Sequence, residues 1–199
     1  MSQPRAVIFD YGNVLSQAQK DSDIHAMASL LALEPAPFAD AYWRFRVAYD
    51  EAQLGPVAYW RAVAEAADRP VTSEQIERLR KLDVDSWILP NREMVDWAKS
   101  LRGLGTRTAV LSNMPVDLRD YLLGPQSWLP EFDHLTFSCD VRSSKPDAAI
   151  YLHCLQGLGV AAAEALFIDD REPNVVAARD LGMRAVLFDG KQQRPDIPI

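Results

Sequence analysis

The chain is poor in the residue types on which several classes of protein depend. It has only two cysteines and three histidines, and none of them shows the spacing of metal ligands. We expect Cys139 and Cys154 to be buried thiols in a reducing cytoplasm, with a disulfide as the alternative. No apolar run is long enough to cross a bilayer, and we expect neither a signal peptide nor contact with a membrane.

Positive charge is also scarce, because 28 acidic residues outnumber 21 lysines and arginines and give a formal net charge of −7. This balance argues against binding to nucleic acid or to an anionic membrane, since both require a basic surface. A small anionic substrate stays compatible, because one site can be locally positive. We therefore expect a small-molecule partner for a chain that is a monomer or a homodimer.

Five short apolar runs predict strands, and they cover Arg5–Asp10, Arg107–Ser112, Leu135–Cys139, Ala165–Asp169 and Arg184–Phe188. From residue 107 onward the runs alternate with helical patterns, which is typical of a parallel sheet with helices on both faces. Residues 16–89 contain no convincing strand and four helical patterns. The sequence therefore predicts an α/β fold, with a doubly wound core (1–15 and 90–199) and an inserted all-helical lobe (16–89).

Several helix boundaries can be read from the sequence. Phe38–Gln53 and Val57–Ala67 have helical spacing, and Thr72 with Gln75 forms a capping box for the next helix. Asn91 is placed to cap a helix that ends before Gly105. We expect the tail, residues 191–199, to be irregular.

Reactive side chains follow the predicted strands at four points, which are Asp10, Ser112 with Asn113, Lys145, and Asp169 with Asp170. Open parallel sheets bind ligands at the carboxyl ends of their strands. Three carboxylates in one crevice repel each other unless a proton or a cation joins them, and a divalent metal is the simplest cation. A carboxylate can also attack phosphorus and form a covalent intermediate. The sequence therefore predicts a metal-dependent enzyme with an aspartate nucleophile.

Four segments, in order, resemble the motifs of the haloacid dehalogenase superfamily of hydrolases. They are Phe9-Asp10-Tyr11-Gly12-Asn13-Val14, Leu111-Ser112-Asn113, Ser144-Lys145-Pro146 and Phe167-Ile168-Asp169-Asp170-Arg171-Glu172-Pro173-Asn174. The resemblance covers the whole chain, and the helical lobe matches the family's cap. It implies a Rossmann-like core, an aspartate nucleophile and Mg²⁺.

By position, the resemblance implies a role for each matching residue. Asp10 is the nucleophile and a metal ligand, and Lys145 pairs with Asp10 and with the phosphate. The remaining roles are the Gly12 carbonyl as a further metal ligand, Ser112 and the Asn113 N–H as phosphate donors, and Asp170 with Asp169 as the rest of the metal site. Asp169 alone could be either a ligand or a support.

Gly12 departs from the pattern of most phosphatases in this superfamily, which have a second aspartate there as general acid and base. The Asp-x-Gly-Asn-Val form resembles a branch that includes sugar-1-phosphate phosphatases. Loss of a general acid costs about 10²–10⁴-fold in rate, and it matters less for a good leaving group. We therefore expect an activated substrate, such as an anomeric sugar phosphate or an acyl phosphate, unless a cap residue replaces the acid.

One face of the predicted helix Phe38–Gln53 carries polar and aromatic side chains, which are Tyr42, Arg46, Tyr49, Asp50 and Gln53. Such a face suits a sugar or an anion, so Arg46 and Tyr42 are predicted to bind substrate. The competing interpretation is a solvated face whose tyrosines pack on the next helix.

The leading interpretation is a Mg²⁺-dependent phosphatase of a small phosphorylated metabolite. A 2-haloacid dehalogenase stays open, because those enzymes also lack the second aspartate, although they need no metal. A binding protein on a degenerate enzyme fold and a sugar phosphomutase are further alternatives.

Overall fold

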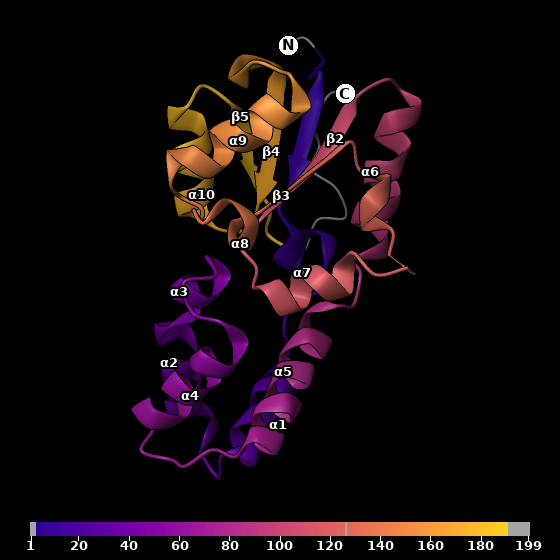
Figure 1. Cartoon of the computed structure of the whole chain (residues 1–199). Coiled ribbons are helices and arrows are strands. Elements are labelled where there is room, and N and C mark those ends of the chain that lie inside the picture. The colour runs from indigo at the N-terminus through magenta and orange to yellow at the C-terminus, as the bar shows by residue number, and fades with distance from the viewer. Residues whose placement is uncertain (1–2, 126, 191–199) are drawn as a thin grey trace.

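The computed structural model describes residues 3–125 and 127–190, and at its centre is a parallel sheet of five strands (Figure 1). The strands lie in the order β3-β2-β1-β4-β5. Their bounds are β1 Ala6–Phe9, β2 Arg107–Ser112, β3 His134–Phe137, β4 Ala165–Asp169 and β5 Arg184–Leu187. The sheet and its helices confirm the predicted α/β fold. The prediction for the tail lies outside the described residues.

Helices cover both faces of this sheet, because successive side chains of a strand point to opposite sides. Val7 and Phe9 of β1 face helix α6 (Arg92–Gly103), where the ring of Phe9 packs edge-on against Trp97 at 5.4 Å. Ile8 faces the opposite way, toward α9 (Ala148–Leu158) and α10 (Glu172–Asp180). The central strand is therefore buried on both faces, as its apolar run predicts.

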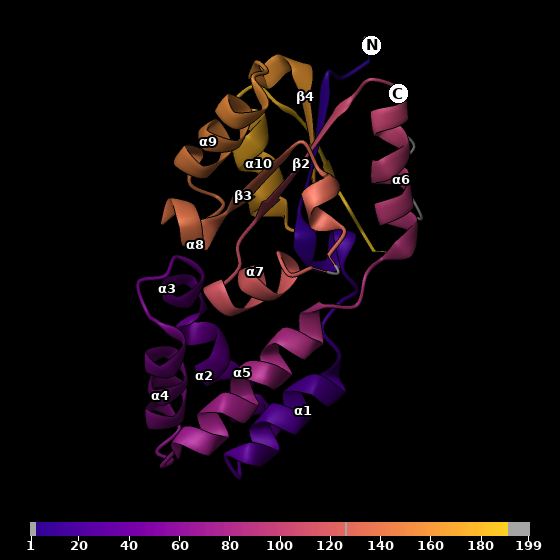
Figure 2. The same cartoon turned by 45° about the vertical axis from the view of Figure 1, so that its right-hand side comes forward.

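The helices of the cap gather at one end of the molecule, beyond the carboxyl ends of the strands (Figures 1 and 2). They are α1 Asp21–Leu30, α2 Pro35–Arg44, α3 Arg46–Asp50, α4 Pro56–Ala66 and α5 Ser73–Trp87. They enclose their own apolar core around the fully buried Trp60. The chain enters and leaves this region side by side, since Ser16 and Pro90 form an antiparallel bridge. That residues 16–89 fold as a separate unit stays a prediction.

Two predicted elements differ from the observed ones. The single helix expected over 38–53 is divided at Phe45, whose backbone (φ −106°, ψ 3°) leaves the helical region. The strand expected to reach Cys139 ends at Phe137, because its partner strand β2 ends opposite it at Ser112. Ser138 then begins the short helix α8 (Ser138–Val141), so Cys139 is helical.

The predicted helix boundaries at Thr72 and Asn91 are confirmed. Thr72 and Gln75 exchange the two hydrogen bonds of a capping box, at 2.9 and 3.2 Å. Asn91 caps α6 by accepting from the Met94 N–H at 3.5 Å. No helix in the ranges 3–125 and 127–190 is both long enough and apolar enough to cross a membrane.

Polar contacts fasten the cap to the core. Arg80 of α5 holds Asp117 of α7 (Val116–Leu122) with two bonds of 2.8 and 2.9 Å, and Tyr49 donates to the same carboxylate at 3.1 Å. Nearer the sheet, Ser144 donates to Glu51 at 2.5 Å. A bidentate arginine contact fixes orientation as well as distance. These contacts therefore hold the cap over the carboxyl edge of the sheet.

Candidate active site

The register of the two central strands brings the aspartates of the first and fourth motifs together. Phe9 of β1 lies opposite Ile168 of β4, and the Asp10 N–H donates to the Ile168 carbonyl at 2.8 Å. β2 and β3 extend the sheet to one side of β1, whereas β4 and β5 extend it to the other. Ligands of open α/β sheets bind at the carboxyl ends of the strands where the order reverses in this way.

Lys145 is the buried cation of this site. Its Nζ lies 2.7 Å from Asp10 Oδ1 and 2.6 Å from Asp169 Oδ2. Burial lowers the pKa of Lys145, but Asp10 and Asp169 outweigh burial, so its pKa is raised overall and the ammonium is kept. Asn113 fixes the position of this lysine, because its amide accepts from the Lys145 N–H at 2.8 Å and donates to the Lys145 carbonyl at 3.0 Å.

Asp10 is held with one carboxylate oxygen bound and the other without a partner among the described residues. Oδ1 accepts from Lys145 and from the Tyr11 N–H at 2.7 Å. Burial raises the pKa of Asp10 from 3.8 to about 7; Lys145 opposes this rise, and the charges of Asp169 and Asp170 add to it. The free oxygen is the one available to attack an electrophile or to bind a cation.

The two adjacent aspartates at the end of β4 have different surroundings. Asp169 is fully buried, and its oxygens accept from Lys145, from the Arg171 N–H at 2.8 Å and from the Asn174 amide. Asp170 is only half-buried and accepts from Asn13 at 2.7 Å. The structure therefore favours Asp170 as the metal ligand and Asp169 as the support of Lys145.

The donor set fits a divalent cation. Oxygen atoms of Asp10, Asp169 and Asp170 lie within 4.8 Å of one another, and Lys145 supplies one positive charge against three negative ones. Burial also raises the pKa of Asp170, and the neighbouring Asp169 adds to the rise. Carboxylate oxygens are the ligands of hard cations such as Mg²⁺. A cation would remove the repulsion that adds to the effect of burial on both pKa values.

A cavity of about 650 Å³ separates the cap from the strand ends. The core residues of its wall include Asp10, Gly12, Ser112, Asn113, Lys145 and Asp170. The cap contributes Trp43, Arg46, Val47 and Asp50, and Trp87 and Leu118 complete its apolar side. The predicted core residues thus meet at one cavity. Sequence reasoning missed the part played by Trp43, Trp87 and Leu118, which have no motif to mark them.

Arg46 and Tyr42, both predicted to bind substrate, are placed differently. Arg46 lies in the cavity wall and donates from Nε to Asp50 at 2.8 Å and from Nη1 to Asp83 at 3.2 Å. Tyr42 is fully buried behind it, donates to Asp83 at 2.6 Å and accepts from Arg46. The prediction that Tyr42 binds substrate is therefore corrected: Tyr42 does not line the cavity but packs in the core of the cap, where it contacts Arg46 and Asp83.

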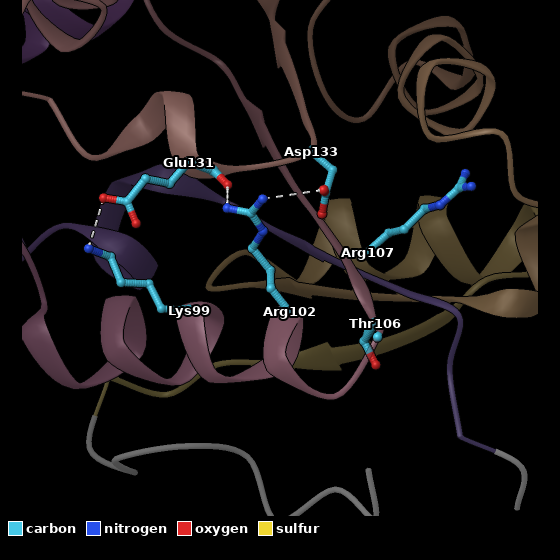
Figure 3. A pocket seen from close by; sticks show the side chains of 7 residues that line it. Lys99, Arg102, Thr106, Arg107, Glu131 and Asp133 are labelled. Atoms are coloured by element: carbon cyan, nitrogen blue, oxygen red, sulfur yellow. Dashed lines mark hydrogen bonds and ion pairs between the residues drawn. The ribbon is translucent and has the colours of Figure 1, made fainter.

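A second pocket lies at the opposite end of the strands (Figure 3). Its cations are already engaged, since Lys99 pairs with Glu131 at 3.1 Å and Arg102 pairs with Asp133 at 3.8 Å. Arg107 donates to a backbone carbonyl of α9. Paired cations at the amino ends of the strands offer little to an anionic ligand, so the cavity beneath the cap is the candidate site.

Solved structures share this fold over nearly their whole length. A HAD family enzyme of Bacteroides thetaiotaomicron, determined as a magnesium complex, has a TM-score of 0.79 and 18% identity, over 96% of both chains. An L-2-haloacid dehalogenase has a TM-score of 0.70 and 21% identity, over 99% of this chain and 89% of its own. At such identities the likeness establishes the fold alone.

Curated relatives match about half of the chain. Acyl-CoA dehydrogenase family member 10 of Mus musculus is 34% identical over 100 residues, 48% of this chain and 9% of that protein. Sesquiterpene phosphatase astK of Aspergillus oryzae is 32% identical over 95 residues, 47% of this chain and 48% of that protein. The chain spans less than half the length of these relatives. A family model for haloacid dehalogenase-like hydrolases matches residues 4–182. The chain therefore belongs to the haloacid dehalogenase-like hydrolases.

Proposed function

We propose that this hydrolase is a Mg²⁺-dependent phosphatase that acts on a small phosphorylated metabolite through an aspartyl phosphate on Asp10. The observation that carries the proposal is that three carboxylates lie together beside one buried lysine in the cavity beneath the cap. Lys145 bonds two of them, and the structure gives Asp170 no ion pair among the described residues. The excess of negative charge in this site suits a bound cation, and a bound cation in turn suits an anionic substrate.

Each residue of the site has a separate role in the proposed reaction. The unpartnered oxygen of Asp10 attacks phosphorus, and the bond from phosphorus to the leaving oxygen breaks. Lys145, the Ser112 hydroxyl and the Asn113 N–H neutralise and orient the phosphoryl oxygens. Oxygens of Asp10 and Asp170, with the Gly12 carbonyl, would hold Mg²⁺, which supplies further positive charge to the phosphoryl group. Water then hydrolyses the aspartyl phosphate and restores Asp10.

The absence of a carboxylate at residue 12 limits the leaving group. Glycine offers no proton to the departing oxygen, so substrates whose leaving group needs none are favoured. An acyl phosphate meets this condition, and an anomeric sugar phosphate meets it better than a phosphate on an ordinary alcohol does. Glucose 1-phosphate should therefore be hydrolysed faster than glucose 6-phosphate, and equal rates for the two would contradict this part of the proposal.

A metal-free 2-haloacid dehalogenase is the second candidate, and Gly12 is the observation in its favour. In that reaction Asp10 attacks carbon and displaces halide. Asp170 weighs against it, because a half-buried third carboxylate that has no ion pair among the described residues has no use in a metal-free site.

The test is phosphate release from a panel of phosphorylated metabolites, with and without Mg²⁺, for the wild type and for Asp10→Asn. The proposal expects release that requires Mg²⁺ and disappears in the variant. Chloride release from 2-chloropropionate without metal, and no phosphate release from any ester, would replace the phosphatase with the dehalogenase.

A further inference from the structure

We infer that the substrate carries its phosphate on a flat, apolar body that packs on Trp43 of α2, Val47 of α3 and Trp87 in the cavity wall. The inference rests on the proposed phosphatase function and concerns the part of the substrate that leaves. It follows from three features of the cavity: the surface above Gly12, the exposed apolar side chains of the cap, and the charge around Arg46.

The indole of Trp87 covers Gly12. A Cβ atom added at Gly12 would lie 3.5 Å from Trp87 Cζ3 and 3.9 Å from Cε3, which is ordinary van der Waals contact. The Tyr11 hydroxyl fixes this part of the chain by donating to the Trp87 carbonyl at 2.9 Å. Residue 12 is where a general acid would meet the leaving group. In this chain the leaving group meets carbon atoms of an indole ring there instead.

The cap places two exposed apolar side chains on the same cavity. Trp43 is 50% exposed and Val47, one turn further on, is 61% exposed, and both line the wall. Trp43 is held in place because its ring packs edge-on against the buried Tyr42 at 4.8 Å. Exposed apolar residues beside a cavity mark a ligand surface more often than isolated ones do. A fixed aromatic ring in the wall of the same cavity as Trp87 suits a flat ligand.

Although Arg46 is a cation in the cap wall of the cavity, it does not attract a second anionic group of the substrate. Its guanidinium is bonded to both Asp50 and Asp83, so one positive charge faces two carboxylates. Burial raises the pKa of Asp50 to about 6; Arg46 opposes this rise, and Asp83 adds to it. A carboxylate or second phosphate on the substrate would meet this negative surplus, whereas an uncharged body would not.

The experiment compares aryl phosphates of similar leaving-group acidity, in the presence of Mg²⁺. Naphthyl phosphate should exceed phenyl phosphate in kcat/KM by about tenfold, because the second ring adds apolar surface to bury. Carboxyphenyl phosphate should fall below phenyl phosphate. Trp43→Ala should remove the preference for the naphthyl ester, and Trp43→Phe should keep most of it. Leu152→Ala is the matched control, since Leu152 is 54% exposed on α9, outside the cavity wall, and it should change nothing.

The outcomes separate this inference from the proposed function. Equal kcat/KM for the three aryl esters, or a naphthyl preference that survives in Trp43→Ala, would overturn the inference and leave the phosphatase standing. No Mg²⁺-dependent phosphate release from any ester would overturn both. A thermal unfolding curve of Trp43→Ala that matches the wild type shows that a lost preference reflects the cavity and not the fold.

Discussion

The replacement of Asp10 by asparagine should stabilise the metal-free protein at neutral and alkaline pH. Burial and two neighbouring carboxylates raise the pKa of Asp10 from 3.8 to about 7, in spite of Lys145. At about 1.4 kcal/mol for each factor of ten, the rise corresponds to about 4 kcal/mol. Asparagine keeps the acceptor for Lys145 and removes the charge, and Lys145 keeps its bond of 2.6 Å to Asp169.

The sign of the pH dependence follows from the direction of this pKa shift. The folded protein binds the extra proton between pH 3.8 and about pH 7, so the contribution of Asp10 to stability is present below this range and lost as pH rises through it. The stability difference between Asp10→Asn and the wild type should thus be small near about pH 4 and reach roughly 2–4 kcal/mol near about pH 8. Mg²⁺ should shrink it, because the ion relieves the repulsion in the wild type only.

Urea unfolding in the presence of a chelator, followed by tryptophan fluorescence at several pH values, measures this difference. Asp120→Asn is the control, because Asp120 is 65% exposed in its ion pair with Arg119, and its stability should change by less than about 0.5 kcal/mol at every pH. A difference for Asp10→Asn that does not grow with pH, or a variant less stable than the wild type near about pH 8, would refute the reasoning.

Three further perturbations probe the same site. Lys145→Met should lower the free energy of unfolding by about 3–5 kcal/mol, because it leaves two buried carboxylates without the positive charge that pairs with them. Lys99→Met should shift the free energy of unfolding by less than about 0.5 kcal/mol, and similar losses for the two variants in urea unfolding would contradict the assignment. Mg²⁺ should raise the Tm of the wild type by mass action, and calorimetry of Asp170→Asn should show little or no increase. Tyr42→Phe should cost about 1–3 kcal/mol, because Asp83 loses a buried donor, while KM should stay near that of the wild type; a large rise in KM would restore Tyr42 as a substrate contact.

The parts of this molecule that could be predicted from its sequence are those fixed by local patterns. An apolar run of four or five residues that ends in an aspartate, as at Asp10 and Asp169, defines both a buried strand and the edge where its carboxylate lies. Because parallel strands share one carboxyl edge, the order of these apolar runs predicts that the residues after them lie close together. The capping box at Thr72 is equally local, and the structure confirms it.

The parts that could not be predicted depend on tertiary packing. Trp87 meets Gly12 across 75 residues, and no spacing or motif in the sequence connects them. In the cap, Tyr42 and Arg46 share one helical face, but a periodic pattern does not say which edge of the face meets a cavity. The wall residues Trp43, Arg46, Val47 and Asp50 themselves follow helical spacing, whereas Tyr42 lies beside that stripe in the core of the cap.

The most direct test of the central claim is to trap the covalent intermediate on Asp10. The wild type is mixed with naphthyl phosphate and Mg²⁺, quenched in acid during turnover, and digested for mass spectrometry. The account predicts one phosphoryl group on the peptide that contains Asp10, labile to hydroxylamine as an acyl phosphate is, and absent from Asp10→Asn. Phosphate release at full rate with no phosphoryl group on that peptide at any quench time would contradict it.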